Sequence, residues 1–70
     1  MKTYYVNNDQ TQNPGWHHEV HTAEHASELR IRNKTLIGFY DDEVQAVQAA
    51  KRIYRDADGC IDCCPRVHRG

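Results

Sequence analysis

The stretch Asp58-Gly59-Cys60-Ile61-Asp62-Cys63-Cys64-Pro65 contains all three cysteines of this 70-residue chain within five residues. Cys60 and Cys63 have the C-x2-C spacing, which allows two thiolates on one tight turn to reach the same metal ion. Gly59 precedes them and gives the backbone the freedom that such a turn needs. The stretch therefore predicts half of a metal site, and the fold depends on where the other half lies.

The other half is expected among the histidines, four of which lie between residues 17 and 25. His21 and His25 are spaced H-x3-H, so both rings can face one point if a helix begins directly after a strand. Zinc takes four N or S ligands tetrahedrally, usually as two closely spaced pairs. We therefore predict one Zn²⁺ ion, and its expected ligands are His21, His25, Cys60 and Cys63.

Some neighbouring side chains are alternatives for one of these ligands, namely Cys64, His17, His18 and His68. Cys64 can also be a passive buried thiol, or a reactive thiolate whose pKa is lowered by the metal and by Arg66. In a further alternative without metal, the cysteines are small buried hydrophobes and the histidines are polar surface residues. The sequence favours the metal because four of the five histidines accompany all three cysteines.

A catalytic zinc is not expected. His18-Glu19-Val20-His21 superficially resembles the zincin motif, but that motif needs two residues between the glutamate and the second histidine, and here there is one. Four protein ligands also leave no coordination position for a reactive water. We therefore expect a non-enzymatic protein with a structural metal.

The size of the chain favours a bound metal as well. Residues 1–70 are enough for a single zinc-binding domain, and a chain this short buries only roughly 60% of its unfolded surface. Apolar residues make up 39% of the sequence. Because the binding free energy of a structural metal becomes folding free energy, zinc would compensate for a small core.

The charge excludes a dedicated nucleic-acid binder, since nine basic residues stand against ten acidic ones and the net charge is −1. Eight of the nine basic residues lie from Arg30 onward, so we expect them to gather on one side and to bind nucleic acid weakly at best. The alternative partner is a protein. The N-terminal residues lack the apolar run of a secretory signal, which predicts a cytoplasmic protein with reduced thiols and no membrane association. We expect a monomer.

Apolar patterning predicts an α+β fold with a three-stranded antiparallel sheet. The expected strands are residues 2–7, 16–21 and 35–40, with a turn at Asn13-Pro14-Gly15 and the last strand in the centre of the sheet. Thr22 can cap a short helical turn. Asp42 can cap the main helix, whose apolar positions extend to Ile53 and Tyr54 and which Gly59 ends.

In this order of elements the chain resembles the small zinc domain of the adaptive-response methylphosphotriester DNA repair protein. The residues that carry this Ada-like resemblance are His21-x3-His25, Leu29, Arg32-Asn33, Leu36-Ile37-Gly38-Phe39, Asp41-Asp42-Glu43, Ala46, Ala49-Ala50 and Cys60-x2-Cys63. The resemblance implies the same fold and metal ligands at positions 21, 25, 60 and 63. In that family a zinc-bound thiolate accepts a methyl group from the DNA phosphate.

The chain is also similar to small uncharacterised bacterial proteins with an HEVH motif and a C-terminal DGCxxCCPxCH motif. Residues 18–21, residues 58–65 and His68 match these motifs, whereas His25 and Val67 stand where that pattern has cysteine. Two thiolates and two neutral imidazoles make a formally neutral zinc site, and four thiolates make a negatively charged, nucleophilic one. The resemblance therefore implies the fold and the ligand positions without the methyl transfer.

These observations predict a zinc-stabilised module that binds a protein or a nucleic acid. The alternative is a thiol-based metal or redox sensor, or an alkyl acceptor, that uses Cys63 or Cys64. The reactivity of the thiols in the metal-bound protein distinguishes the two, because a structural site protects its thiolates.

Overall fold

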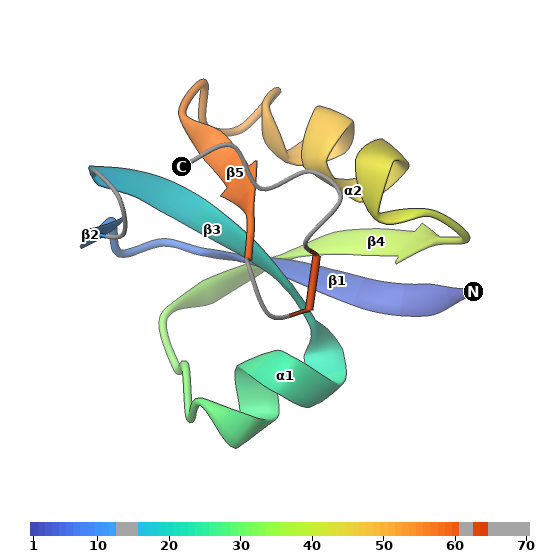
Figure 1. Cartoon of the computed structure of the whole chain (residues 1–70), viewed down its shortest axis with the longest axis horizontal. Helices are drawn as coiled ribbons and strands as arrows, with labels where there is room; N and C mark the ends of the chain where they lie inside the picture. Colours follow the sequence, from blue (N-terminus) through green and yellow to red (C-terminus); the bar gives the residue numbers. More distant parts are fainter. Residues whose placement is uncertain (13–15, 61–62, 65–70) are drawn as a thin grey trace.

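The computed structural model describes residues 1–12, 16–60 and 63–64. Five strands and two helices follow one another along the chain (Figure 1). Their bounds are β1 Lys2–Asn7, β2 Thr11–Gln12, β3 Trp16–Thr22, α1 Ala23–Glu28, β4 Lys34–Tyr40, α2 Glu43–Ala50 and β5 Ala57–Gly59. The turn predicted at residues 13–15 lies outside the described residues.

The sheet confirms the α+β class but is not a three-stranded antiparallel sheet. β1 lies between β3 and β4 and is antiparallel to both, and the two-residue β2 pairs antiparallel with the beginning of β3. β5 is parallel to β3 and pairs with it from His18 to Val20, which makes the sheet mixed. β5 was not predicted, because a three-residue Ala-Asp-Gly strand has no apolar alternation and few β-favouring residues.

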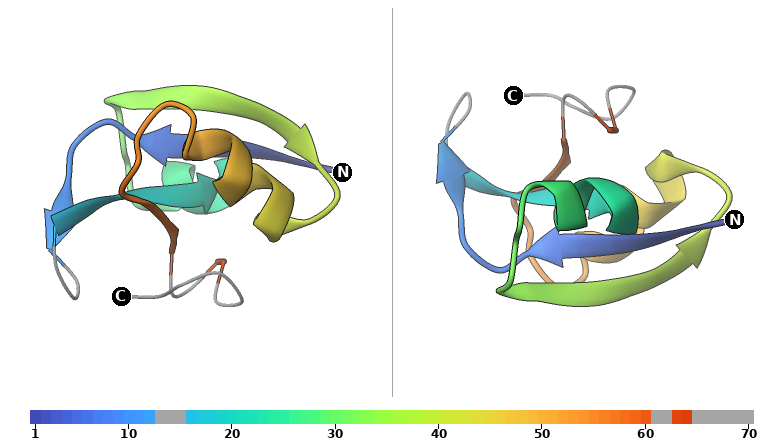
Figure 2. Two further views of the ribbon diagram at one scale, coloured as in Figure 1. Left: turned by 90° about the horizontal axis from the view of Figure 1, so that it is seen from above. Right: turned by 90° about the horizontal axis from the view of Figure 1, so that it is seen from below.

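The two helices lie on opposite faces of the strands: α2 is in front when the molecule is seen from above, and α1 is in front when it is seen from below (Figure 2). The main core lies between α2 and the sheet. Its buried members are Tyr4, Val6, Val20, Ala46, Val47, Ala50, Ala57 and Cys64. Most of these side chains are small, so the apolar area removed from water is modest.

β4 is an edge strand rather than the predicted central one. β1 and β3 take the inner places, since β1 pairs with β3 and β4, and β3 pairs with β1, β2 and β5, whereas β4 pairs with β1 alone. The register between β1 and β4 shifts at Tyr4 and Tyr5, whose partners are Gly38 and Leu36. This bulge turns Leu36 and Phe39 toward the same face, where their exposed fractions are 51% and 62%. Gly38 has a φ of 144°, which favours glycine.

α2 begins as predicted and ends early. The Asp42 side chain accepts a hydrogen bond from the Val44 N–H at 2.9 Å, as expected of an N-cap. The helix ends at Ala50 instead of continuing toward Gly59, and Ile53 is 48% exposed. The chain must leave the helix because residues 57–59 pair as a strand with β3.

α1 is short and is held at both ends. The Thr22 hydroxyl accepts a hydrogen bond from the His25 N–H at 3.2 Å, which confirms the predicted cap. At the other end the Arg30 N–H donates to the Ser27 carbonyl and the Ile31 N–H to the Ala26 carbonyl, each at 3.0 Å. These two bonds form a Schellman motif. Its left-handed position is Arg30, with a φ of 57°, where glycine is usual.

Among the described residues, neither helix has the length and apolar character needed to span a membrane.

Candidate metal centre

The structure brings His21, His25, Cys60 and Cys63 together. One potential ligand atom from each residue lies within 4.8 Å of those of the other three, close enough to hold a metal ion. His21 is almost fully buried, Cys60 is buried, and the other two are half-buried. The two pairs are 35 or more residues apart in the sequence, so only the tertiary fold joins them.

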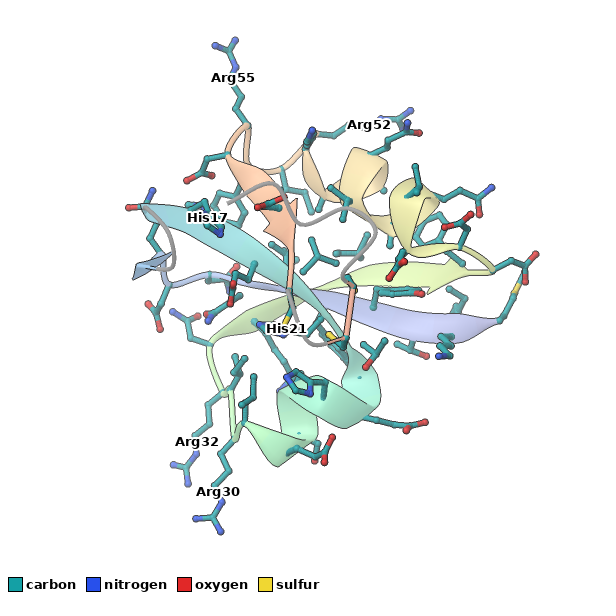
Figure 3. The ribbon with its side chains drawn as sticks, in the orientation of Figure 1. His17, His21, Arg30, Arg32, Arg52 and Arg55 are labelled. Atoms are coloured by element: carbon teal, nitrogen blue, oxygen red, sulfur yellow. The ribbon has the colours of Figure 1, made fainter. Side chains whose placement is uncertain are left out.

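The backbone around β3 explains how the two pairs meet. His21 is near the end of β3 and His25 is in the first turn of α1, so the strand-to-helix junction capped by Thr22 places their ring centroids 5.5 Å apart. Cys60 follows β5 directly, and its N–H donates to the Val20 carbonyl at 3.0 Å. This bond extends the pairing of β5 with β3 and places Cys60 beside the end of β3, where His21 lies (Figure 3).

The surroundings of each imidazole indicate which nitrogen faces the centre. His21 Nδ1 is 3.8 Å from the Cys63 Sγ, and its Nε2 is 3.7 Å from a carboxylate oxygen of Glu19. His25 has the opposite arrangement: Nδ1 is 3.8 Å from a Glu28 carboxylate oxygen, and Nε2 is buried without a hydrogen-bond partner among the described residues. Each ring therefore has one nitrogen toward a carboxylate and the other available as a ligand.

These residues fit a tetrahedral zinc ion. Zinc bonds of about 2.0 Å to nitrogen and 2.3 Å to sulfur place tetrahedral ligand atoms roughly 3.3 to 3.8 Å apart. The Cys63 Sγ to His21 Nδ1 separation of 3.8 Å is within that spacing. A buried His25 Nε2 without a partner is unfavourable, and a metal would satisfy it. Two sulfur and two imidazole ligands are a donor set that zinc prefers.

The electrostatics of the cysteine turn favour a thiolate at Cys63. The Cys64 thiol, with its sulfur 3.8 Å away, donates to the Cys63 sulfur and lowers the pKa of Cys63. Burial opposes this effect, while the Thr22 N–H and the neighbouring His21 ring lower the pKa further, and the resulting pKa is about 3. The same hydrogen bond and burial raise the pKa of Cys64. Cys63 therefore carries the charge that a metal ligand needs.

The described alternative ligands, Cys64, His17 and His18, have other surroundings than the four clustered residues, although the Cys64 sulfur lies 3.8 Å from the Cys63 sulfur. Cys64 is fully buried in the main core, as expected of a passive thiol. The His18 ring stacks on the Tyr54 ring with centroids 3.7 Å apart, and its Nδ1 contacts an Asp56 carboxylate oxygen at 2.5 Å. Burial alone would raise the pKa of Asp56, but hydrogen bonds from Gln10 and His18 lower it. His18 is thereby held against Tyr54 and Asp56, and His68 lies outside the described residues.

His17 belongs to a chain of carboxylates and imidazoles that the sequence analysis did not foresee. Its Nε2 is 3.8 Å from Glu19 and 3.7 Å from Asp58, and the other Glu19 oxygen faces His21. His17, Glu19 and His21 share one face of β3 because side chains alternate along a strand. That alternation was visible in the sequence, whereas the approach of Asp58 from β5 was not.

The Glu19 carboxylate lies 3.7 Å from His21 Nε2, which has no hydrogen-bond partner among the described residues, and we expect its charge to orient His21 and to favour the proton on Nε2. A carboxylate behind a metal-binding histidine fixes the tautomer and increases the basicity of the ligand. We expect Glu19→Gln to lower the zinc affinity by roughly 10- to 100-fold. The measurement is a competition titration against a chromophoric chelator. The matched control is Glu24→Gln, an exposed residue of α1; equal affinities for the two variants would contradict the role of Glu19.

The basic residues that the structure describes do not gather on one side as predicted, and Arg66 and Arg69 lie outside the described residues. Arg30 and Arg32 extend from the loop after α1, whereas Arg52 and Arg55 extend from the opposite end of the molecule, beyond α2 (Figure 3). The prediction failed because it assumed that the loop after α1 and the end of α2 both lie beside the segment that contains the cysteines. The helices lie on opposite faces of the sheet instead.

Comparisons of the chain with models of protein families, with curated proteins and with solved structures give no match.

Proposed function

We propose that this chain is a structural zinc domain that serves as a non-enzymatic binding module in the cytoplasm. The observation that carries the proposal is the meeting of His21, His25, Cys60 and Cys63 at one point. Four protein ligands complete a tetrahedral shell and leave no position for a reactive water. The ion would connect the β3–α1 junction to the turn after β5, and it would thereby cross-link segments that are distant in the sequence.

The Ada-like resemblance adds support from the sequence for zinc at positions 21, 25, 60 and 63 and for a protein or nucleic-acid partner. The separation of Arg30 and Arg32 from Arg52 and Arg55 leaves only small basic surfaces. Because non-specific DNA binding depends on many phosphate contacts, the nucleic-acid alternative would be weak and sensitive to salt. A monomer is sufficient for the proposed site because all four ligands come from one chain.

Elemental analysis of freshly purified, tag-free protein is expected to find one zinc per chain. The zinc-loaded protein should also resist mild alkylation, because a closed site protects its thiolates. Mass spectrometry before and after a short incubation with iodoacetamide measures this protection, and protein denatured in the presence of a chelator is the control. A folded protein without metal would contradict the proposal.

A second candidate function is a thiol-based sensor or alkyl acceptor that uses Cys63 or Cys64. The half-buried position of Cys63 favours it over the other two, since Cys60 and Cys64 are buried. In alkyl transfer the Cys63 thiolate would form an S–C bond as the C–O bond of a methyl phosphotriester breaks, and a phosphodiester anion would leave. Rapid modification of Cys63 in the zinc-loaded protein, with release of the metal, would favour this candidate over the structural one.

A further inference from the structure

A second site is suggested by a cavity of about 380 Å³ on the α1 face of the sheet, remote from α2. It lies between α1, the loop that follows it, and the neighbouring strands β1 and β4. Its polar lining consists of Tyr5, Ser27, Arg30, Arg32 and Lys34. Three of these five side chains are cationic, and none of the described residues that line the cavity is acidic. In a chain with a net charge of −1, this is a local concentration of positive charge.

Contacts within the protein hold the cationic segment in place. The Lys34 ammonium donates to the Ile31 carbonyl at 2.8 Å and lies 5.3 Å from the centre of the Tyr5 ring. Asn33, between Arg32 and Lys34, is tied to the loop after β1: its carbonyl accepts from the Asn8 N–H at 2.9 Å. A second bond joins the side chains of Asn8 and Asn33 at 3.0 Å. A ligand would thus meet a largely preformed site and would have to order little of the backbone.

Arg30 is fixed in a different way. The Schellman motif at the end of α1 puts its backbone at a φ of 57°, a conformation that most residues with a side chain avoid. Glycine would suit this position better, and it would remove one of the three charges around the cavity. Arg30 thus contributes a cation here at the expense of backbone strain, a combination that is found at ligand sites.

We propose that this cavity binds a phosphate monoester of a small molecule. Guanidinium groups bind phosphate oxygens through paired, charge-assisted hydrogen bonds, and the lysine adds a point charge and the serine a hydroxyl donor. The volume is at the lower end of the range for small-molecule sites. Nucleic acid is less well matched, because within the described part of the chain Arg52 and Arg55 are at the other end of the molecule and do not extend a basic track from this cavity (Figure 3).

The test is a titration of the zinc-loaded protein, followed by amide NMR, with inorganic phosphate and with glycerol phosphate at constant ionic strength in chloride. We expect saturable shifts at Ala23, Ser27 and residues 30–34, with dissociation constants in the millimolar range or below. A short duplex and a single strand of DNA are separate arms. Shifts that do not saturate, or DNA binding that is tighter and extends to Arg52, would overturn the proposal.

The variant Arg30→Gly separates binding from folding. We expect it to weaken phosphate binding by about tenfold, which is the effect of losing one charge-assisted contact, and to raise Tm by roughly 4 °C or more through relief of the left-handed strain. Arg32→Ala should weaken binding similarly without the gain in Tm. Arg55→Ala, at the opposite end, is the matched control and should bind phosphate as the parent does. Equal binding by Arg30→Gly, Arg32→Ala and the parent would exclude this cavity.

The proposal does not rest on the identity of the metal, because the cavity needs only the folded β1–α1–β4 framework. Zinc content is measured on each variant by elemental analysis. A variant that loses phosphate binding but retains one zinc shows an effect on the cavity and leaves the metal centre intact. A variant that loses both zinc and the folded state shows an effect on the metal centre and does not test the cavity.

Discussion

Removal of the metal by a strong chelator is expected to unfold most of the chain. The buried core consists largely of valine, alanine and cysteine, so its apolar burial contributes little to stability. Structural zinc sites contribute about 10 to 16 kcal/mol of apparent binding free energy at pH 7, comparable with or larger than the whole stability of a small domain. The dispersed amide spectrum of the loaded protein should collapse toward random-coil positions, and the far-UV circular dichroism should fall with it.

Adding zinc back should restore the dispersed spectrum, and magnesium should not, because it requires oxygen ligands in an octahedral arrangement. The zinc content of the chelated sample has to be measured on the same preparation. A dispersed spectrum from a sample without zinc would show that the core alone maintains the fold. The metal would then be incidental to stability even if it binds at the four residues.

The Cys60→Ser variant is expected to lose both zinc and the folded state. Cys60 is buried, and the bond from its N–H to the Val20 carbonyl fixes it beside β3. A serine hydroxyl is a poor zinc ligand, so the variant would retain only His21, His25 and Cys63 as effective ligands. We expect the zinc affinity to fall by at least about 100-fold, which is more than the fall expected when the carboxylate of Glu19 is removed.

Cys64→Ala is the matched control, because Cys64 is a neighbouring cysteine that the structure places in the core. This variant should retain one zinc and should lose only about 1 kcal/mol of stability through the small cavity that it leaves. Because it also removes the thiol next to the Cys63 sulfur, we expect a fall in zinc affinity that is far smaller than for Cys60→Ser. Chelator competition and thermal unfolding measure the two quantities. If Cys64→Ala loses zinc and Cys60→Ser keeps it, the ligand set of the centre is different from the one proposed here.

The local elements were predictable because each has a short-range signal. Alternation of Tyr4, Tyr5 and Val6 identified β1, and the hydroxyl of Thr22 and the carboxylate of Asp42 identified the starts of the two helices. The C-x2-C and H-x3-H spacings identified four candidate ligands, and the structure brings all four together. That they bind zinc remains a prediction until the metal is measured.

The place of each element in the sheet was not predictable in the same way. The apolar composition of residues 35–40 suggests a buried central strand, but the number of neighbours of a strand depends on which other segments pair with it. β4 has one partner, β1, and therefore lies at the edge of the sheet, where Leu36 and Phe39 are exposed. The early end of α2 also depends on distant segments. The helix stops at Ala50 because residues 57–59 pair with β3, a strand more than 35 residues earlier in the chain.

The sequence by itself determined the kinds of secondary structure, the caps and the candidate ligands, because these depend on neighbouring residues and on the chemistry of single side chains. Only the tertiary structure decided which side chains surround the ligands. It places Glu19 behind His21, Asp58 beside His17, and Cys64 in the core. It also assembles the cationic cavity, whose lining comes from β1, α1, the following loop and β4. The position of Glu19 also follows from the alternation along β3, but the other neighbours are set by packing between distant segments, and no local pattern encodes them.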